Sequence, residues 1–246
     1  MAPRLRVITY NIRKGKGASG RSTAGVDALG RALSGLAPDV VLCQEVFVGH
    51  GAAAPQTQVL ADLLGLSLLY EPNRQRKHGH HGNATYSRHP VSDVRNYDVS
   101  TNRIERRGVL YARLSVGGQV VHVLNAHLGL NSWQRLAQVK SIGEILREQT
   151  KAHEPVLLAG DFNDWHGRLD HVITEQLGLT NAFADVPARR LSTWHAARPL
   201  FNLDRVYVRN LAPRDAHRLD GKPWHGLSDH LPLWVELELG AVACAA

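Results

Sequence analysis

Two apolar runs joined by a pair of glycines constrain the fold of this chain more than any other feature. The runs are GVLYARLSV (108–116) and QVVHVLNAHL (119–128), and Gly117-Gly118 separates them. Two glycines between runs of this composition are a strong signal for a β-hairpin. The hairpin implies antiparallel pairing, and therefore a sheet whose faces other elements must cover.

The elements expected around this hairpin are helices and short strands. Apolar residues recur at helical spacing in 22–36, 56–66, 132–149 and a shorter stretch near 168–177. In 132–149 the side chains expected to face inward are Trp133, Leu136, Val139, Ile142 and Leu146. The other expected strands are 6–11, 40–46, 66–72, 83–88, 92–99, 155–163, 203–208 and 231–239. This pattern predicts an α/β fold of two packed sheets with helices outside.

Composition bounds the class of protein. The chain has 246 residues, 43% hydrophobic and 21% charged, which is typical of a soluble globular protein. We expect one domain over 1–246, with a loose tail at 240–246. The net charge of +7 favours anionic partners such as nucleic acid, phosphorylated molecules or acidic lipid. The alternative is a basic surface that serves solubility alone.

Sequence features also bear on the cellular location and the oligomeric state. No apolar signal segment precedes LRVITYN, and no run approaches the length of a membrane span. We therefore expect a cytoplasmic protein without a transmembrane segment, and a monomer. The two cysteines, Cys43 and Cys244, have no zinc-type spacing, and we expect no disulfide.

Polar side chains stand at the ends of six expected strands. They are listed here in chain order: Asn11; Glu45; Asn125 and His127; Asp161, Asn163 and Asp164; Asp204; Asp229 and His230. Alternate residues of a strand share a face, so Asp161 and Asn163 point the same way while Phe162 points into the core. A Gly-Asp pair after a strand is often only a turn. Six such ends in one chain are harder to explain by turns.

The chemistry of these side chains is coherent. Magnesium takes hard oxygen ligands, usually one or two carboxylates, which Glu45 and Asp229 can supply. Cleavage of a phosphodiester also needs a group that orients or deprotonates water and donors for the phosphoryl oxygens. Suitable types for these roles are Asp161, Asn163, His127 and His230.

An ordered set of motifs resembles a known family. The motifs are TYNIRKGKG, QEV, GNATYSRHP, NAHLGL, GDFND, NLDRVYV and LSDHLPL, between residues 9 and 233. They resemble, in order, those of the endonuclease/exonuclease/phosphatase superfamily, which includes pancreatic-type deoxyribonuclease, repair nucleases, neutral sphingomyelinases and inositol-polyphosphate 5-phosphatases. The resemblance implies a deoxyribonuclease-like four-layer α/β sandwich with two mixed or antiparallel sheets. It also implies phosphoester cleavage that depends on Mg²⁺, with Mn²⁺ as the alternative ion.

The resemblance also implies roles for single residues. Glu45 would bind the metal, supported by Asn11 and Asp229. Asp161 would align or deprotonate the attacking water, and Asn163 would donate to the phosphate or the attacking oxygen. His230, oriented by Asp204, would contact the phosphate, and His127 would be a donor near the leaving group. Whether one metal ion or two binds stays open.

The motifs differ between branches of the superfamily. NAHLGL is closer to the deoxyribonuclease and sphingomyelinase branches than to the Tyr-x-Pro-Asn pattern of the repair nucleases, and the whole set is most similar to small bacterial cytoplasmic members. No acid in 76–89 can orient His127, so His81 or Asn83 is the expected substitute. Candidate contacts to the substrate phosphate are Arg107, Asn83 and Lys14.

The substrate class has three readings. Basic loops at 13–16, 74–77 and 103–108 favour a nuclease acting on DNA or RNA, with Trp165, Trp194 and Trp224 as candidates for base stacking. The alternative is a phosphodiesterase or phosphatase of phospholipid head groups or small phosphorylated molecules. The third reading is an inactive interaction module.

A cluster of three histidines is a less suitable metal site. His78, His80 and His81 lie close together in RKHGHHGN, but imidazole is a poor ligand for magnesium. We expect this loop to form a basic lip at the mouth of the phosphate site.

Overall fold

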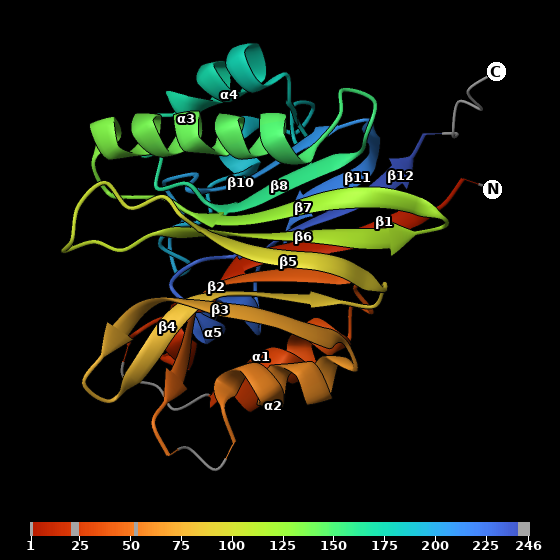
Figure 1. Ribbon diagram of the computed structural model, residues 1–246. Helices are drawn as coiled ribbons and strands as arrows, with labels where there is room; N and C mark the ends of the chain where they lie inside the picture. The colour runs from red at the N-terminus through yellow and green to blue at the C-terminus, as the bar shows by residue number, and fades with distance from the viewer. Residues whose placement is uncertain (1, 21–24, 52–53, 241–246) are drawn as a thin grey trace.

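Two six-stranded sheets pack face to face in the computed structural model, which describes residues 2–20, 25–51 and 54–240 (Figure 1). The first sheet has the order β11 (Leu211–Arg218), β12 (Leu233–Leu239), β1 (Arg4–Asn11), β2 (Val40–Gly49), β4 (Gly79–Ser87), β3 (Ser67–Arg76). The second has the order β5 (Val91–Asp98), β6 (Gly108–Val116), β7 (Gln119–His127), β8 (Val156–Asp161), β10 (Asp204–Arg209), β9 (Thr180–Asn181).

Helices cover the outer faces of both sheets. On the first sheet lie α1 (Gly25–Ser34), α2 (Gln56–Leu64) and the short α5 (Trp224–Leu227). On the second lie α3 (Ser132–Gln149) and α4 (Leu169–Leu177), seen at the top of Figure 1. Short 3₁₀ helices occupy Arg13–Gly15 and Ala188–Arg190. The predicted four-layer α/β sandwich is therefore confirmed. Among the described residues, the helices lack the combination of length and apolar character needed to cross a membrane.

Three apolar cores fill the spaces between the four layers. Strand β1 illustrates why its sequence is apolar on both faces: Leu5 and Val7 enter the core between the sheets, whereas Ile8 and Tyr10 enter the core beneath α1 and α5. Side chains of a strand alternate between faces, so a central strand covered on both sides must be apolar throughout.

The predicted hairpin is present as β6 and β7. Val116 pairs with Gln119 across a turn in which Gly117 and Gly118 have φ of 57° and 82°. Positive φ at both turn positions matches the right-handed twist of the strands, and glycine adopts it without a steric cost. The hairpin thereby fixes the register of the second sheet.

Helix α3 turns a different face to the core than its apolar spacing predicts. Trp133 and Leu136 are exposed, 58% and 48%, while Val139, Ile142 and Leu146 are buried as expected. Polar side chains take the inward positions in the first turns: Gln138 accepts the backbone N–H of Gly129, and Arg135 donates to the carbonyl of Leu130. These bonds hold the segment between β7 and α3 and rotate Trp133 and Leu136 to the surface.

Besides the two 3₁₀ helices, three elements were not expected from the sequence: β9, β11 and α5. Strand β11 is an exposed edge strand that contains Pro213 and an irregularity between Pro213 and Asp215, so its sequence does not alternate cleanly. Of the predicted segments, residues 22–24 of the first helix and 241–246 of the tail lie outside the described residues.

The strand pairing brings the polar strand ends to one end of the molecule. Strands β7 and β8 are parallel, so His127 lies opposite Asp161, and antiparallel β10 begins with Asp204 opposite Asp161 as well. Asn11 ends β1 in the other sheet and reaches Asp161 with a hydrogen bond. The ends of both sheets therefore meet there.

Candidate active site

Asp161 is the centre of this meeting point. Its Oδ2 accepts a hydrogen bond of 2.9 Å from Asn11 Nδ2, and its Oδ1 accepts one of 2.9 Å from the backbone N–H of Asn163. The same Oδ2 lies 3.5 Å from His127 Nε2 and 3.8 Å from His230 Nε2. A buried carboxylate thus faces two imidazoles and one amide, contributed by both sheets.

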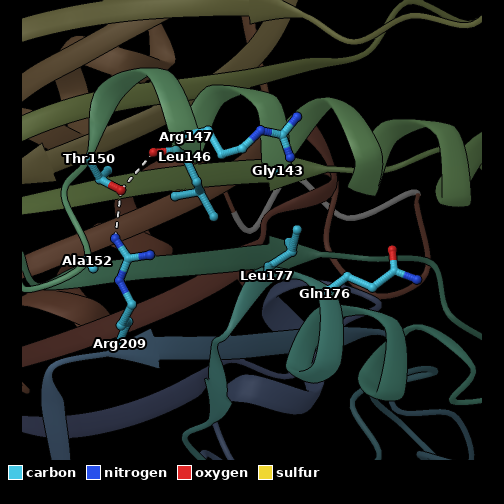
Figure 2. A pocket seen from close by; sticks show the side chains of 8 residues that line it. All are labelled: Gly143, Leu146, Arg147, Thr150, Ala152, Gln176, Leu177 and Arg209. Atoms are coloured by element: carbon cyan, nitrogen blue, oxygen red, sulfur yellow. Dashed lines mark hydrogen bonds between the residues drawn. The ribbon is translucent and has the colours of Figure 1, made fainter.

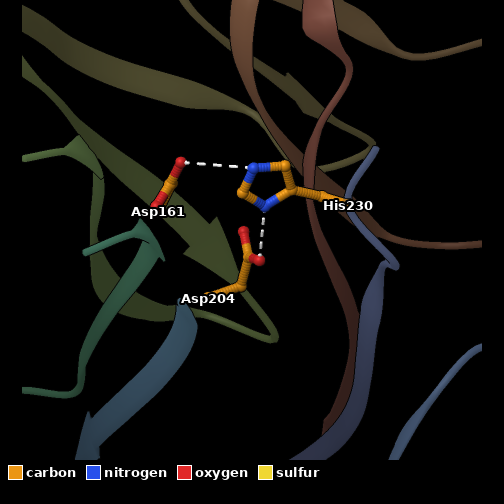
Figure 3. A group of neighbouring side chains, drawn as sticks. All are labelled: Asp161, Asp204 and His230. Carbon is orange, nitrogen blue, oxygen red and sulfur yellow. Dashed lines mark hydrogen bonds and ion pairs between the residues drawn. The ribbon is translucent and has the colours of Figure 1, made fainter. Parts of the chain in front are cut away.

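His230 lies between two carboxylates. Its Nδ1 is 2.8 Å from Asp204 Oδ2, and its Nε2 faces Asp161, as Figure 3 shows. Asp204 is held in place by the start of β10, where Thr193 Oγ1 accepts the backbone N–H groups of Leu203 and Asp204. The ring orientation of His230 is therefore fixed by one carboxylate while the other nitrogen points at Asp161.

Burial and neighbouring charges set the protonation of these groups. Burial disfavours the charged form of His230, but Asp204 and Asp161 outweigh it and raise the pKa of His230 to about 10. Burial raises the pKa of Asp161 to about 6, with Asp204 acting in the same direction and His230 opposing it. The arrangement therefore favours an imidazolium beside a carboxylate that gains its proton only below neutral pH.

His127 has the opposite preference. Burial, followed by the positive charges of Arg107 and His230, holds the pKa of His127 well below its usual value. The two histidines that face Asp161 thus differ in charge at neutral pH. Asn163 lies beside them with φ of 49°, and its Nδ2 donates 2.9 Å to the carbonyl of Leu128, just after His127.

Two further carboxylates each face a cationic side chain. Glu45 Oε2 lies 3.3 Å from Lys14 Nζ, and Asp229 Oδ2 lies 3.3 Å from Arg13 Nε. Burial opposes ionisation of Glu45, but Lys14 followed by His230 keeps the pKa of Glu45 below its usual value. Glu45 has φ of 55° at an irregularity in the pairing of β2 with β4. Such backbone strain in a non-glycine residue is typical of functional sites.

The donor set at Glu45 and Asp229 fits a hard divalent cation. Both offer carboxylate oxygens, the ligand type that magnesium prefers, and each carboxylate is compensated by a cation. Asp161, Asp204 and His230 also have ligand atoms within 4.8 Å of one another. His230 could join such a group as a ligand only in its neutral form, because an imidazolium has no free lone pair on its ring nitrogens.

A small hollow lies next to the cluster around Asp161 and has His127 in its lining. It is lined by Glu45, Asn73, His81, Gly82, Asn83, Arg106, Arg107 and His127. Asn83 is 1% exposed, and its Nδ2 donates to the carbonyls of Gly108 and Asn125, so this amide nitrogen ties the two sheets together. Arg107 is held at 2.7 Å by Glu105.

The histidine-rich segment borders this hollow, but the expectation that it is a loop is wrong for two of its histidines: β4 begins at Gly79, so His80 and His81 lie within a strand paired with β3. Only His81 of its three histidines is among the lining residues, while His80 Nδ1 is 2.8 Å from the hydroxyl of Tyr70 and stacks on its ring.

Two of the three tryptophans named as stacking candidates lie together near His230. Trp165 packs against Trp194 and Phe201, and the backbone of Trp194 pairs with His230. The prediction for Trp224 is wrong: it is 7% exposed and packs edge-on against Tyr10, because α5 covers the first sheet.

A larger pocket of about 320 Å³ lies away from Asp161, between α3 and α4 (Figure 2). Arg209 lies at its edge and donates to the hydroxyl of Thr150. Arg209 ends β10, whereas Asp204 begins it, so this pocket is at the opposite end of the strand. None of the predicted site residues lines it.

Three residues that hold the site were not identified from the sequence. Arg13 pairs with Asp229, Thr193 positions Asp204, and Ser228 Oγ donates 2.7 Å to the carbonyl of Asn11. Ser228 precedes Asp229 in LSDHLPL and Arg13 follows Asn11 in NIRKGKG, so position within the motifs was an available signal. Thr193 lies outside every motif, and only the fold brings it to Asp204.

Comparison with known proteins decides the family. Residues 8–230 match the endonuclease/exonuclease/phosphatase family. The chain belongs to this family. It is 37% identical to the uncharacterized protein YbhP of Escherichia coli K12, over 96% of both chains. Its fold resembles that of an endonuclease/exonuclease/phosphatase from Beutenbergia cavernae, with a TM-score of 0.81 and 23% identity, covering 99% of this chain and 74% of the other.

A more distant relative has a named activity. The chain is 27% identical to an inositol phosphosphingolipids phospholipase C of Schizosaccharomyces pombe, over 73% of this chain and 46% of that protein. Members of the endonuclease/exonuclease/phosphatase family hydrolyse phosphoric esters, and the buried Asp161, Asp204 and His230 of this chain form an acidic and imidazole group of the kind that such chemistry uses.

Proposed function

We propose that this protein hydrolyses phosphodiesters with the help of a divalent cation, Mg²⁺ or Mn²⁺. The observation that carries the proposal is the position of Asp161, whose Oδ2 faces Asn11, His127 and His230 at 2.9, 3.5 and 3.8 Å. A carboxylate with a pKa near neutrality, flanked by one charged and one neutral imidazole, can take a proton while its neighbours donate to a phosphoryl group.

Glu45 and Asp229 are the proposed metal ligands, supported by Asn11. The bound ion would neutralise charge on the phosphoryl oxygens as a Lewis acid. Lys14 and Arg13, which face these carboxylates, are then available for the substrate's negative oxygens. Arg107, on the far side of the hollow with Asn83, is the other proposed phosphate contact.

The chain's own residues complete the displacement. Asp161, ionised above about pH 6, orients the attacking water and accepts its proton as the oxygen bonds to phosphorus. His230, held protonated by Asp204, donates to a non-bridging phosphoryl oxygen, and Asn163 donates to the phosphate or the attacking oxygen. The bond from phosphorus to the leaving oxygen breaks, and His127 lies on that side as the hydrogen-bond donor.

Two substrate classes are proposed for this site. Nucleic acid is supported by the net charge of +7 and by the basic loops at the site, Arg13 to Lys16 and Arg103 to Arg107. Phospholipid head groups are favoured by the similarity to the phospholipase C over 73% of this chain.

The proposal is tested with a panel of substrates. Purified protein is incubated with Mg²⁺ or Mn²⁺ and bis(p-nitrophenyl) phosphate, p-nitrophenyl phosphate, plasmid DNA, single-stranded RNA and phospholipid vesicles. We expect hydrolysis of the diester that EDTA abolishes. Asp161→Asn and His230→Gln should each lower kcat/KM by at least about 100-fold, the range expected for loss of acid–base groups.

Matched controls are Asp62→Asn and His153→Gln, which change the same residue types at exposed positions of α2 and of the segment after α3. Both should retain wild-type rates. Folded wild-type protein that cleaves none of the substrates would support the inactive interaction module, and activity that survives EDTA would contradict the role of the metal.

A further inference from the structure

Large apolar side chains gather at one end of the described surface. Seven are exposed in the described residues, and six of them form what we call the apolar rim: Ile104, Leu130, Trp133, Leu136, Leu200 and Phe201. The seventh, Val94, lies within β5. Ile104 is 80% exposed and Trp133 is 58% exposed, and exposed apolar side chains that gather on one part of a surface often mark an interaction site.

The register of the second sheet places most of the rim at the end of the molecule where His127 and Asp161 lie. Asp98 pairs with Gly108, and Val109 pairs with Ala126, so the β5–β6 connection that carries Ile104 projects beyond the end where β7 reaches His127. Leu130 and Trp133 follow His127 into α3, and Leu200 and Phe201 precede Asp204. Figure 1 shows the β5–β6 connection and the start of α3 at the same end of the sheets.

Cations without ion pairs are interleaved with these apolar side chains. Arg103, Lys140, Arg168 and Arg198 are exposed and form no ion pair within the described part of the chain. Arg103 adjoins Ile104, Lys140 lies one turn after Leu136, and Arg198 lies two residues before Leu200. By contrast, Arg106 and Arg107 in the same connection pair with Asp98 and Glu105. The rim thus combines apolar side chains with unpaired cations, while Asp98 and Glu105 in the β5–β6 connection are already paired.

We propose that the apolar rim docks the active site onto the surface of an anionic phospholipid bilayer. Aliphatic and indole side chains lose water when they enter the boundary between head groups and acyl chains, and adjacent Arg and Lys side chains bind the negative head groups. A nucleic-acid backbone offers contacts to the cations but leaves Ile104, Leu130 and Leu136 in water, so charge and apolar exposure together fit a lipid surface better.

The proposal deepens the proposed function, on which it rests for what the docked site does. The phosphodiesters of phospholipid head groups lie in the plane that the rim would contact. Docking would therefore bring such a substrate to Asp161 and His230 without lifting the lipid out of the bilayer. Binding to the bilayer and hydrolysis are measured separately, so the docking proposal and the proposed function can each be contradicted independently of the other.

The probe is a set of vesicles of phosphatidylcholine with or without phosphatidylglycerol. Binding is measured by co-sedimentation and by quenching of tryptophan fluorescence with brominated phospholipid. We expect the wild-type protein to bind the anionic vesicles, with binding that weakens as NaCl increases. The double variant Leu130→Ser/Trp133→Ser should bind at least about tenfold more weakly, and Arg103→Glu/Arg198→Glu should lose its preference for phosphatidylglycerol.

Matched controls are Val94→Ser, an exposed apolar residue outside the rim, and Arg31→Glu, an exposed cation on α1. Both should bind vesicles like the wild type. Circular dichroism of every variant checks the fold. If the rim variants bind as the wild type does, or if the wild type binds single-stranded DNA but not vesicles, the docking proposal is wrong.

Hydrolysis gives the second, independent measurement. For the rim variants, the ratio of vesicle phospholipid hydrolysis to bis(p-nitrophenyl) phosphate hydrolysis should fall at least about tenfold, whereas the two controls keep the wild-type ratio. Vesicle binding without any diester hydrolysis would leave docking intact and overturn the proposed function. Diester hydrolysis without vesicle binding would do the reverse.

Discussion

His127 and His230 face the same oxygen of Asp161 but hold their protons differently. His230 has a carboxylate on each ring nitrogen, so its charged form is stabilised despite burial. His127 has Asp161 on one side, but burial and then the surrounding cations lower its pKa, so its neutral form is favoured. Neither preference follows from the residue type, since both histidines have the same pKa in water. The difference arises from the strands and loops that surround each ring.

The pH dependence of kcat/KM follows from these two groups. Asp161 must be ionised to accept a proton, so activity should rise with pH through about 6. His230 must be protonated to donate, so activity should fall as pH approaches about 10. Asp204→Asn removes the larger of the charges that raise the pKa of His230, and the alkaline limb should move down by at least about one unit. A pH–rate profile with a soluble diester measures both limbs.

The control for this prediction is Asp220→Asn, which removes a carboxylate that contacts His225 at the surface. Its profile should match the wild type. An alkaline limb that does not move in Asp204→Asn would show that His230 is not the group that titrates there.

At the scale of elements, the pairing of β7 with β8 depends on Gly160. This residue has φ of 145°, and a Cβ atom at its position would lie 1.9 Å from the carbonyl oxygen of Ala126. Only glycine allows the two strands to approach so closely immediately before His127 and Asp161. The glycine of GDFND therefore serves strand pairing, and the aspartate after it serves the site.

Gly160→Ala should both destabilise the protein and reduce activity. The added methyl group separates β7 from β8, so the free energy of unfolding should fall by at least about 2 kcal/mol. Under conditions where the variant is folded, kcat/KM should also fall, because His127 and Asp161 move apart. Urea unfolding and diester hydrolysis measure the two effects. Gly35→Ala, which meets no close contact, is the control and should change stability by less than about 0.5 kcal/mol.

The sequence predicted a helix or strand well where one physical requirement determines both its residue pattern and its structure. Strands β1 and β8 are covered on both faces and must be apolar throughout, so their sequences identify them as buried strands. The Gly117-Gly118 turn is also identified, because glycine adopts the positive φ of a tight turn without a steric cost. Strand β11 is not, because an exposed edge strand with a proline has no apolar pattern. The buried face of α3 was misjudged at Trp133 and Leu136, because Gln138 and Arg135 bind the preceding loop and turn inward.

The sequence identified most residues of the candidate site but few of the contacts between them. Strand ends and motifs named Asp161, His230 and Asp204, and the resemblance to the family paired Asp204 with His230. The strand pattern alone did not give that contact, which the antiparallel start of β10 places at 2.8 Å. The amide of Asn83 was expected near the substrate, and the structure shows that its nitrogen binds backbone carbonyls of the opposite sheet. Such contacts join residues far apart in the chain, and local patterns carry no information about them.

At the scale of the whole molecule, the site lies at the interface between the two sheets. Asn11 belongs to the first sheet and Asp161 to the second, and they share a buried hydrogen bond. A second polar link lies nearby, where Gln44 Nε2 donates 2.9 Å to Asn125 Oδ1 and Asn125 Nδ2 donates to the carbonyl of Ala84. These buried amides bind one another, so removing one while the sheets stay packed would leave its partner unpaired, at a cost of about 1–3 kcal/mol.

Activity and global structure should therefore be lost together. Because the catalytic group needs both sheets and the core between them joins the two into one unit, we expect no populated state in which one sheet has left the other. In urea, diester hydrolysis, far-ultraviolet ellipticity and tryptophan fluorescence should follow one transition with the same midpoint. Asn125→Ala should shift all three midpoints downward by the same amount, since it removes a link between the sheets and not a catalytic group. Loss of hydrolysis at a lower urea concentration than loss of ellipticity would instead show that the two sheets separate before either unfolds.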